Sequence, residues 1–401
     1  MSWKTVKLSD IALCIQPGPF GSQLHNADYS DSGTPIIMPK DMIDGHISHT
    51  NLVFVSEEHV KRLNRHQVHE GDLMVARKGD VRKCVYISEK ENGWMTGSDC
   101  LKVSLNKTIC DPHFVYYQLR SPYIGKWLET ISIGATMPSL NSGLLGSIKL
   151  NLPSIEEQHY ISKVLLAYDD LIENNRRQIK LLEEAAQRLY REWFVDFRFP
   201  GHEQVSIVDG VPEGWTVKTI EEVASLLRRG ISPVYNERGM YTVISQKCIR
   251  SSIMDISEAR KQEKAYAPEL NLQDSDTVIC STGAGTLGRV GQVFGEYKDT
   301  TFDSHVTLVR AGDKIGKQYL YFTLKEKEDY LKGMGKGSTN QLELYRDVIK
   351  TQKISIPTST ILNQFERMMQ PIHEKIVICC NQIKDLTEGR NAVIPRLLAG
   401  E

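Results

Sequence analysis

The sequence lacks the features that would place the chain in a membrane, in an oxidising compartment or around a structural metal ion. It has 8 cysteines in 401 residues, and none forms a CxxC pair, since Cys379 and Cys380 are merely adjacent. This scatter argues against a disulfide framework or a zinc site. No run of about 18 apolar residues occurs, and the first residues contain no apolar leader segment. We therefore expect a cytoplasmic protein with no membrane span and no bound metal.

An excess of charge of one sign is also missing. The chain has 49 Lys and Arg against 50 Asp and Glu, a formal net charge of −1. This balance excludes a strongly basic, histone-like protein. It does not exclude DNA binding, because affinity for phosphates depends on a local basic face. The 40% hydrophobic and 25% charged residues are typical of globular domains, and the length allows two or three of them.

Recognisable catalytic motifs are missing as well. There is no P-loop, no GxSxG nucleophile elbow and no HExxH zinc motif. Gly283–Gly288 fits GxGxxG, but Arg289–Phe294 then alternates like a strand, whereas a dinucleotide site needs a helix there. A tight hairpin turn accounts for it better. Asp111–Phe114 lacks the second proline of a base-flipping methyltransferase loop and fits a helix cap. These absences favour a protein that is not an enzyme.

The strongest positive signal is an internal duplication with a period of about 200 residues. Four segments of the first half recur in order in the second: Trp3–Lys7 as Trp215–Lys218, Gly71–Val75 as Ser275–Ile279, Gly134–Thr136 as Gly337–Thr339, and Ile148–Pro153 as Lys353–Pro357. All four pairs share nearly the same offset, so the halves align in one register. Each copy is predicted to be a mixed α/β domain followed by a long helix.

Heptad spacing identifies the two long helices. Apolar positions separated by alternating steps of four and three predict a coiled-coil seam rather than an amphipathic surface helix. The first seam is Ile161, Leu165, Tyr168, Ile172, Asn175, Ile179, Leu182, Ala186, Leu189 and Trp193. The second is Ile372, Ile376, Cys379, Ile383, Leu386, Arg390 and Val393. Asn175 is either a register device or a partner contact.

Residues outside the seams carry two further expectations. Charged residues between the seam positions of the first helix, Glu183 among them, should face solvent. Pro371 and Pro395 should break or kink the second helix, because proline lacks the N–H that a helix interior needs.

Connectivity predicts that the two helices are antiparallel. The second mixed domain starts where the first helix ends and finishes where the second begins, so both points must be near each other. The expected fold class is α+β: two similar mixed α/β domains joined by two long antiparallel coiled-coil helices, with pseudo-two-fold symmetry. A helix of about 35 residues spans about 50 Å, enough to act as a spacer. We assign residues 1–153 and 201–357 to the domains, 154–200 to the central helix and 358–401 to the distal helix.

The chain resembles the specificity subunits of type I restriction–modification systems over essentially its whole length, and four short segments in the right order on the two-copy frame carry the resemblance. They are a helix start at Leu152–Ile161, a central exit at Arg191–Gly201, a domain entry at Val211–Trp215 and an ending at Arg390–Glu401. The second copy departs from the pattern at its helix start, where Asn363–Gln364 stand in place of Glu157–Gln158.

This resemblance implies two target recognition domains, each reading one half of a split, asymmetric site in double-stranded DNA. It also implies that the helices set the spacing and dock two modification (methyltransferase) subunits, with restriction (motor-nuclease) subunits joining for cleavage. The chain itself would bind no cofactor. Its partners would use S-adenosylmethionine, and ATP with Mg²⁺ for cleavage. The alternatives are an enzyme acting alone and a coiled-coil assembly protein with no role on DNA.

Candidate DNA contacts follow from the need for Lys and Arg at phosphates and for Arg, Asn or Gln at bases. Lys40 and the loop at 21–23 are second choices in the first domain, and any basic turn can also be plain solvated surface. The best cluster in the first domain is Arg77, Lys78, Arg82 and Lys83. The candidates in the second domain are Arg228, Arg229, Lys247, Arg250, Arg289 and the loop at 336–341, with Lys336 and Asn340 in it.

Overall fold

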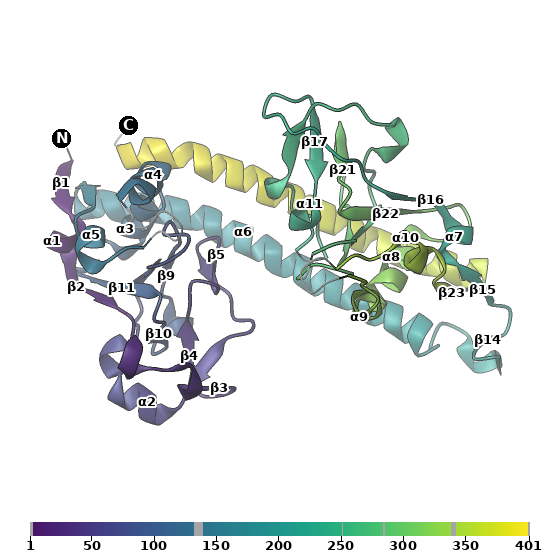
Figure 1. Ribbon diagram of the computed structural model, residues 1–401, viewed down its shortest axis with the longest axis horizontal. Helices are drawn as coiled ribbons and strands as arrows, with labels where there is room; N and C mark the ends of the chain where they lie inside the picture. Colours follow the sequence, from purple (N-terminus) through teal and green to yellow (C-terminus); the bar gives the residue numbers. More distant parts are fainter. Residues whose placement is uncertain (1–2, 132–138, 251, 284, 338–341, 400–401) are drawn as a thin grey trace. The chain divides into compact units, whose positions relative to one another are not determined.

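The computed structural model describes residues 3–131, 139–250, 252–283, 285–337 and 342–399. The chain divides into two compact units (Figure 1). One unit is Met1–Ile172 together with Asp385–Glu401, and the other is Glu173–Lys384. Each long helix therefore contributes to both units.

The first unit contains a four-stranded antiparallel sheet beside a second, smaller sheet. The first sheet has the order β2 (Ala12–Pro17), β11 (Cys100–Leu105), β8 (Leu73–Ala76), β9 (Cys84–Tyr86). The second has the order β10 (Met95–Thr96), β4 (Thr34–Ile37), β7 (Val53–Val55), β3 (Tyr29–Ser30), with β10 and β4 parallel. Two further antiparallel pairs are β1 (Lys4–Lys7) with β12 (Lys149–Leu152) and β5 (Met42–Ile43) with β6 (His46–Ile47). The helices are α1 (Leu8–Ile11), α2 (Glu57–Arg62), α3 (Pro112–Leu119), α4 (Pro122–Ile131) and α5 (Ser142–Gly146).

The second unit repeats this topology, which confirms the duplication. Its larger sheet has the order β16 (Ala224–Arg229), β22 (Val306–Ala311), β19 (Thr277–Cys280), β20 (Val290–Gln292). Its smaller sheet has the order β18 (Arg260–Gln262), β17 (Tyr241–Ile244), β21 (Thr300–Phe302), again with one parallel pair, β17 with β21. Strand β15 (Thr216–Thr219) pairs with β23 (Lys353–Ile356), as β1 does with β12. The helices are α7 (Ile220–Val223), α8 (Lys317–Glu326), α9 (Glu328–Gly333) and α10 (Arg346–Lys350), and a hairpin of β13 (Ile207–Val208) and β14 (Val211–Pro212) precedes β15.

The glycine-rich GxGxxG segment lies in the turn between β19 and β20. The N–H of Gly288 donates to the carbonyl oxygen of Cys280, which closes the turn. A strand follows it, and not a helix. The expected hairpin turn is therefore confirmed, and the described part of this turn offers no helix N-terminus to a phosphate.

The two copies fasten their equivalent helices, α3 and α8, in different ways. Asp111 caps α3 by accepting from the N–H groups of His113 and Phe114, as the sequence predicts. Gly316 precedes α8 and has no side chain to cap it. Instead, Glu366 of the distal helix accepts from the N–H groups of Gln318 and Tyr319, and burial raises the pKa of this carboxyl. The second copy thus replaces a local cap by a long-range one.

The two long helices are α6 (Ile155–Tyr190), which continues into a π turn, η5 (Arg191–Val195), and α11 (Ser359–Ala399). Neither Pro371 nor Pro395 breaks the second helix, because α11 runs through both, so that part of the expectation is wrong. A kink at either proline stays a prediction. A missing N–H removes one helical hydrogen bond. Around Pro371 this loss is opposed by the packing of Met369 and Ile372 into the second unit's core.

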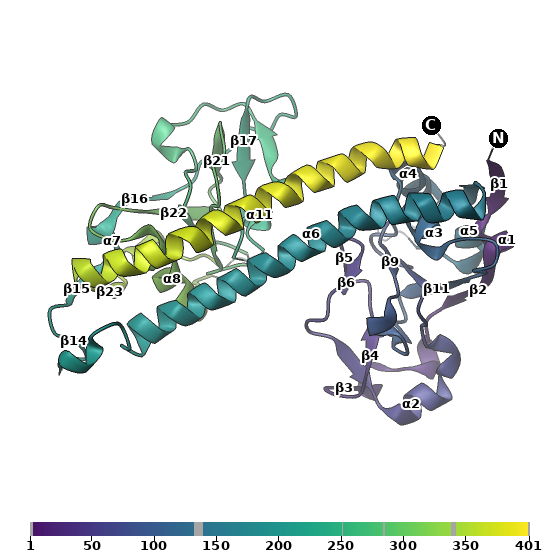
Figure 2. The same ribbon diagram turned by 180° about the vertical axis from the view of Figure 1, so that it is seen from behind.

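The helices pair in antiparallel fashion within each unit (Figure 2). In the first unit Tyr168 lies against Gly389, and Asp169 pairs with Arg390. In the second unit Gln178 lies against Cys379, and the rings of Tyr190 and Phe365 are 6.2 Å apart. In the second unit the α11 partner number falls as the α6 number rises, so the helices run in opposite directions there. In the first unit the later residues Ile394 and Leu397 of α11 pack against the cluster that contains the earlier residue Ile161 of α6, which gives the same direction. The seam is buried or half-buried at all of its described positions, and Asn175 is buried within it.

Glu183 differs from its expected position on a solvated face. Its Oε1 atom is buried and has no hydrogen-bond partner among the described residues. The side chain faces Tyr321 and Lys325 of α8, and burial raises its pKa to about 7. The heptad pattern located the seam but could not show that a domain covers the neighbouring face of the helix.

Candidate nucleic-acid interface

The basic cluster predicted in the first domain divides into two groups. The guanidinium of Arg77 lies over the ring of Phe20, 5.3 Å from its centroid, and Nζ of Lys78 lies 3.0 Å from Asp99. Arg82 belongs to the other group, since its Nε donates to Asp80 at 2.9 Å and its Nη1 lies 3.3 Å from Glu129. The structure therefore does not bring the four predicted residues together.

Arg82 and Lys83 line a cavity of about 550 Å³ between the β8–β9 turn and α4. Both basic and acidic side chains line it, and the acidic ones are Asp44, Asp80 and Glu129. Partial burial opposes ionisation of Asp80, but the hydrogen bonds and charge of Arg82 hold the pKa of that carboxyl below its usual value. Nζ of Lys83 donates to the carbonyl oxygen of Pro39 at 2.8 Å. A phosphate entering this cavity would have to displace existing partners.

Lys40 is similarly engaged. Its Nζ donates to the carbonyl oxygen of Asn51 at 2.6 Å and lies 3.2 Å from Asp41.

In the second domain most of the predicted cations also have partners. Arg250 donates from Nε to the carbonyl oxygen of Lys247 and lies 3.4 Å from Glu258. Arg289 donates to the carbonyl oxygens of Ile249 and Gly285, so it ties two loops together. The candidates Arg228 and Arg229 pair with Glu269 and Glu343. Lys247 and Lys336 are exposed. Asn340 lies outside the described residues.

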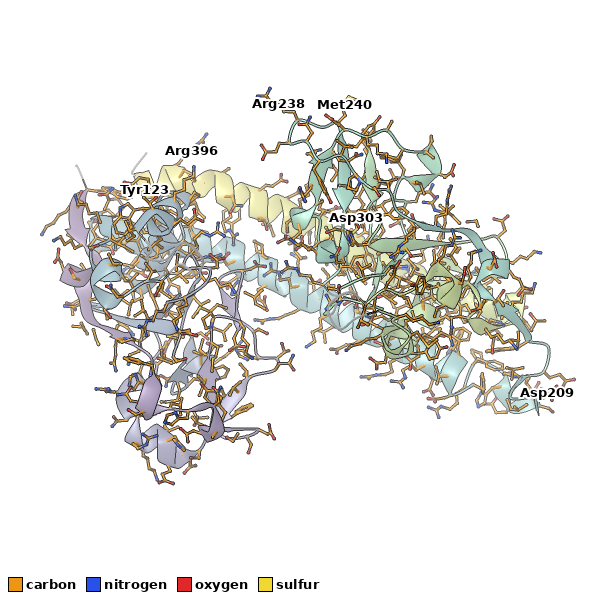
Figure 3. The ribbon with its side chains drawn as sticks, in the orientation of Figure 1. Tyr123, Asp209, Arg238, Met240, Asp303 and Arg396 are labelled. Carbon is orange, nitrogen blue, oxygen red and sulfur yellow. The ribbon has the colours of Figure 1, made fainter. Side chains whose placement is uncertain are left out.

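Sequence reasoning missed a surface on the connection between β16 and β17. Tyr235 stacks with Arg260 of β18, whose guanidinium is 3.4 Å from the ring centroid. Figure 3 shows Arg238 and Met240 projecting outward from the same connection. Met240 is 76% exposed, and Val234 is exposed as well. The available signal was one aromatic residue, one cation and several apolar residues in a segment without strand or helix periodicity.

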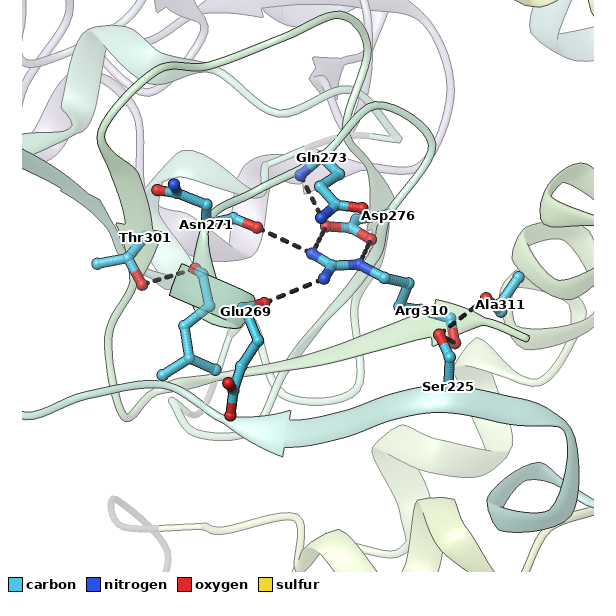
Figure 4. Close-up of polar contacts among 9 residues, drawn as sticks. Ser225, Glu269, Asn271, Gln273, Asp276, Thr301, Arg310 and Ala311 are labelled. Carbon is cyan, nitrogen blue, oxygen red and sulfur yellow. Dashed lines mark hydrogen bonds and ion pairs between the residues drawn. The ribbon is translucent and has the colours of Figure 1, made fainter. Parts of the chain in front are cut away.

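A buried ion pair accounts for one arginine that does not belong to this surface (Figure 4). Arg310 of β22 donates from Nε and Nη2 to the two carboxylate oxygens of Asp276, at 2.8 and 2.7 Å. It also donates to the carbonyl oxygens of Asn271 and Glu269. All of its donating nitrogens are thus occupied within the domain, and its role is structural.

A serine–histidine–aspartate cluster at α11 resembles a catalytic triad only in composition. Both Ser275 and Asp274 contact Nε2 of His373, while Nδ1 faces the amide of Gln318. A triad needs the serine and the carboxylate on different ring nitrogens. The cluster therefore docks the helix onto the second domain.

Metal sites and membrane spans are both missing from the described part of the chain. No group of three or more His, Cys, Asp or Glu residues there is arranged to hold a metal ion. No helix within the same residues is long and apolar enough to cross a membrane.

A family model described as the type I restriction modification DNA specificity domain matches residues 1–184 and 212–394. The chain belongs to this family. The two matched stretches correspond to the two repeats, each with its mixed domain and most of its long helix. The resemblance seen in the sequence is confirmed.

Individual relatives agree with the family match. The MjaIX specificity subunit of Methanocaldococcus jannaschii is 26% identical over 422 residues, covering 100% of this chain and 93% of the relative. The HindI specificity subunit of Haemophilus influenzae is 22% identical over 476 residues, covering 100% and 99%. The crystal structure of a type I S subunit from M. genitalium has the same fold, with a TM-score of 0.57 at 14% identity over 99% of this chain and 96% of that one.

Proposed function

We propose that the chain is the DNA-specificity subunit of a type I restriction–modification complex. Each of its two domains reads one half of a split, asymmetric DNA site, and the helices set the spacing and dock modification subunits. The observation that carries this proposal is the DNA specificity domain found twice, on two domains of one topology. Because the domains differ in sequence, their half-sites should differ as well.

The first experiment measures DNA binding by the full chain. A gel shift with random-sequence duplex at low salt, without and with a modification subunit, should show a complex that weakens steeply as salt rises. A coiled-coil assembly protein with no role on DNA would give no shift in either sample.

Chemistry is assigned to the partners and not to this chain. We propose that modification subunits supply S-adenosylmethionine and that restriction subunits supply ATP with Mg²⁺, the whole complex acting in the cytoplasm. Incubating the pure chain with duplex DNA and labelled S-adenosylmethionine should give no methyl transfer, whereas adding the modification subunit should give transfer. Labelling by the chain alone would overturn this assignment.

The target itself can be found in a host that carries the system. Sequencing of methylated bases should give one motif with two unlike halves around a fixed spacer. A palindromic motif would contradict the reading by two different domains.

A further inference from the structure

The segment that leaves β2 in the first domain corresponds to the segment that leaves β16 in the second. Each begins with a glycine, Gly18 or Gly230, whose N–H donates to the first residue of the adjacent strand, Cys100 or Val306. A Cβ on either glycine would overlap a backbone carbonyl oxygen, that of Gly97 or Phe302. The close approach requires glycine and fixes where the following residues emerge.

Each segment then presents an exposed aromatic ring covered by an arginine. Phe20, two residues after Gly18, is 53% exposed and lies under Arg77. Tyr235, five residues after Gly230, is 42% exposed and lies under Arg260. The two arginines come from different strands or turns, so the shared chemistry is not a simple result of the duplication.

These two guanidiniums differ from most of the other candidate arginines because, among the described residues, no carboxylate is paired with them. Within the residues that the structure describes, neither Arg77 nor Arg260 forms an ion pair. The candidates Arg82, Arg228, Arg229 and Arg250 each form an ion pair with a carboxylate. Arg289 donates to carbonyl oxygens instead. A guanidinium on a ring face retains its N–H donors for an incoming acceptor.

The loop around Tyr235 is held in place before any ligand arrives. The N–H of Asn236 donates to Lys261 and that of Glu263 donates to Val234, so the loop pairs with the β18 segment. The side chain of Asn236 donates to Glu263 at 2.6 Å. A rigid position for ring and guanidinium reduces the entropy lost on binding.

We propose that Phe20 with Arg77, and Tyr235 with Arg260, are the base-reading elements of the first and second domains. This inference rests on the proposed function. The guanidinium donates to acceptor atoms at a base edge, guanine O6 and N7 being its best match, and the ring packs against the neighbouring base or sugar. Exposed apolar side chains such as Met240 and Val234 extend the surface that DNA would cover.

The test selects DNA from a randomised duplex pool with the full chain, alone and with its modification subunit. Wild-type protein should enrich a motif with two halves. Arg260→Gln and Tyr235→Ala should degrade one half only, and Arg77→Gln and Phe20→Ala should degrade the other half only. Affinity for the wild-type motif should fall on the order of 10-fold in each variant.

Arg228→Gln is the matched control, because Arg228 is an exposed arginine that is already paired with Glu269. It should retain both half-motifs. Thermal melting should show that all variants fold, since the substituted rings are exposed.

Several results would overturn the inference while leaving the proposed function intact. One is enrichment of both half-motifs by Arg260→Gln and Tyr235→Ala with unchanged affinity. A second is a uniform loss of affinity with both half-motifs intact, which would indicate phosphate contacts only. A third is a variant that no longer binds the modification subunit but still enriches both half-motifs, which would indicate that the ring and the arginine form a protein interface. If wild-type protein enriches no motif in either sample, the proposed function itself fails.

Discussion

Among single residues, the buried pair of Arg310 and Asp276 should contribute strongly to the stability of the second unit. The two side chains are 16% and 2% exposed. Removing one partner of a buried pair leaves an uncompensated charge and costs about 3–5 kcal/mol. Arg310→Met should therefore lower the free energy of unfolding by about 3 kcal/mol, measured by urea titration.

Arg228→Met provides the comparison for this prediction. Its pair with Glu269 is 53% exposed on both sides, so its loss should cost less than about 1 kcal/mol. If Arg310→Met and Arg228→Met lowered the free energy of unfolding equally, burial would not strengthen the contribution of the Arg310 ion pair.

Glu183 should make stability depend on pH near neutrality. Burial raises its pKa from 4.5 to about 7 in the folded chain. Between these values the unfolded chain loses the proton while the folded chain keeps it, so the free energy of unfolding falls as pH rises. Glu183→Gln should remove this fall and stabilise the protein at pH 8 by at most about 3 kcal/mol, with little change at pH 4.5. If the free energy of unfolding changed with pH in the same way in the wild-type protein and in Glu183→Gln, the result would contradict a buried Glu183 carboxyl.

Sequence alone could nominate cations but could not rank them. Whether an arginine is available depends on partners far along the chain, as with Arg229 and Glu343, which are 114 positions apart. Arg77 and Arg82 are the same residue type in the same turn, yet among the described residues only Arg82 has a carboxylate paired with it. Local pattern does predict local contacts, and the Asp111 cap is where it was expected.

At the scale of elements, Pro371 should weaken α11 in spite of the unbroken helix. Proline in a helix interior is about 3 kcal/mol less favourable than alanine, and part of this is offset because proline restricts the unfolded chain. Pro371→Ala should therefore raise the free energy of unfolding by about 2 kcal/mol in urea titrations. Pro395→Ala should have a smaller effect because it lies in the last turns. A destabilised Pro371→Ala protein would indicate that the packing needs a proline-induced bend.

Heptad spacing and topology were predictable to different extents. The seams could be identified because apolar residues with a period of 3.5 over many turns are specific to coiled coils. The helix-breaking effect of Pro371 was overestimated, because helix propensity describes only the local sequence. The packing of Met369 into the core depends on residues far along the chain and could not be read from that sequence. The parallel pairs β4–β10 and β17–β21 had no signal, since strands of two to four residues are too short to show a period.

At the scale of the whole molecule, the helices should determine the spacer between half-sites. Inserting one heptad in α6 alone should disrupt the seam, because the apolar face keeps its phase but the residues on one side of the insertion are displaced by about 10 Å from their partners on α11. Inserting matched heptads in both helices should lengthen the spacer by about 3 base pairs, since seven residues add about 10 Å and DNA rises about 3.4 Å per pair. Selection from a randomised duplex pool measures the length of the spacer. An unchanged length would contradict the prediction that the helices determine the spacing.

The last turns of α11 belong to the first unit, where Ile394, Leu397 and Leu398 pack against the core cluster that contains Ile161 and Leu165. A ribosome that has finished Ile172 must still add roughly 200 residues or more before these side chains exist. At about 5–20 residues per second, the nascent first unit waits roughly 10–45 s with this apolar surface uncovered. A truncated messenger RNA would leave this apolar surface of the first unit uncovered permanently. Chaperones or proteases could then recognise the unfinished chain by that surface.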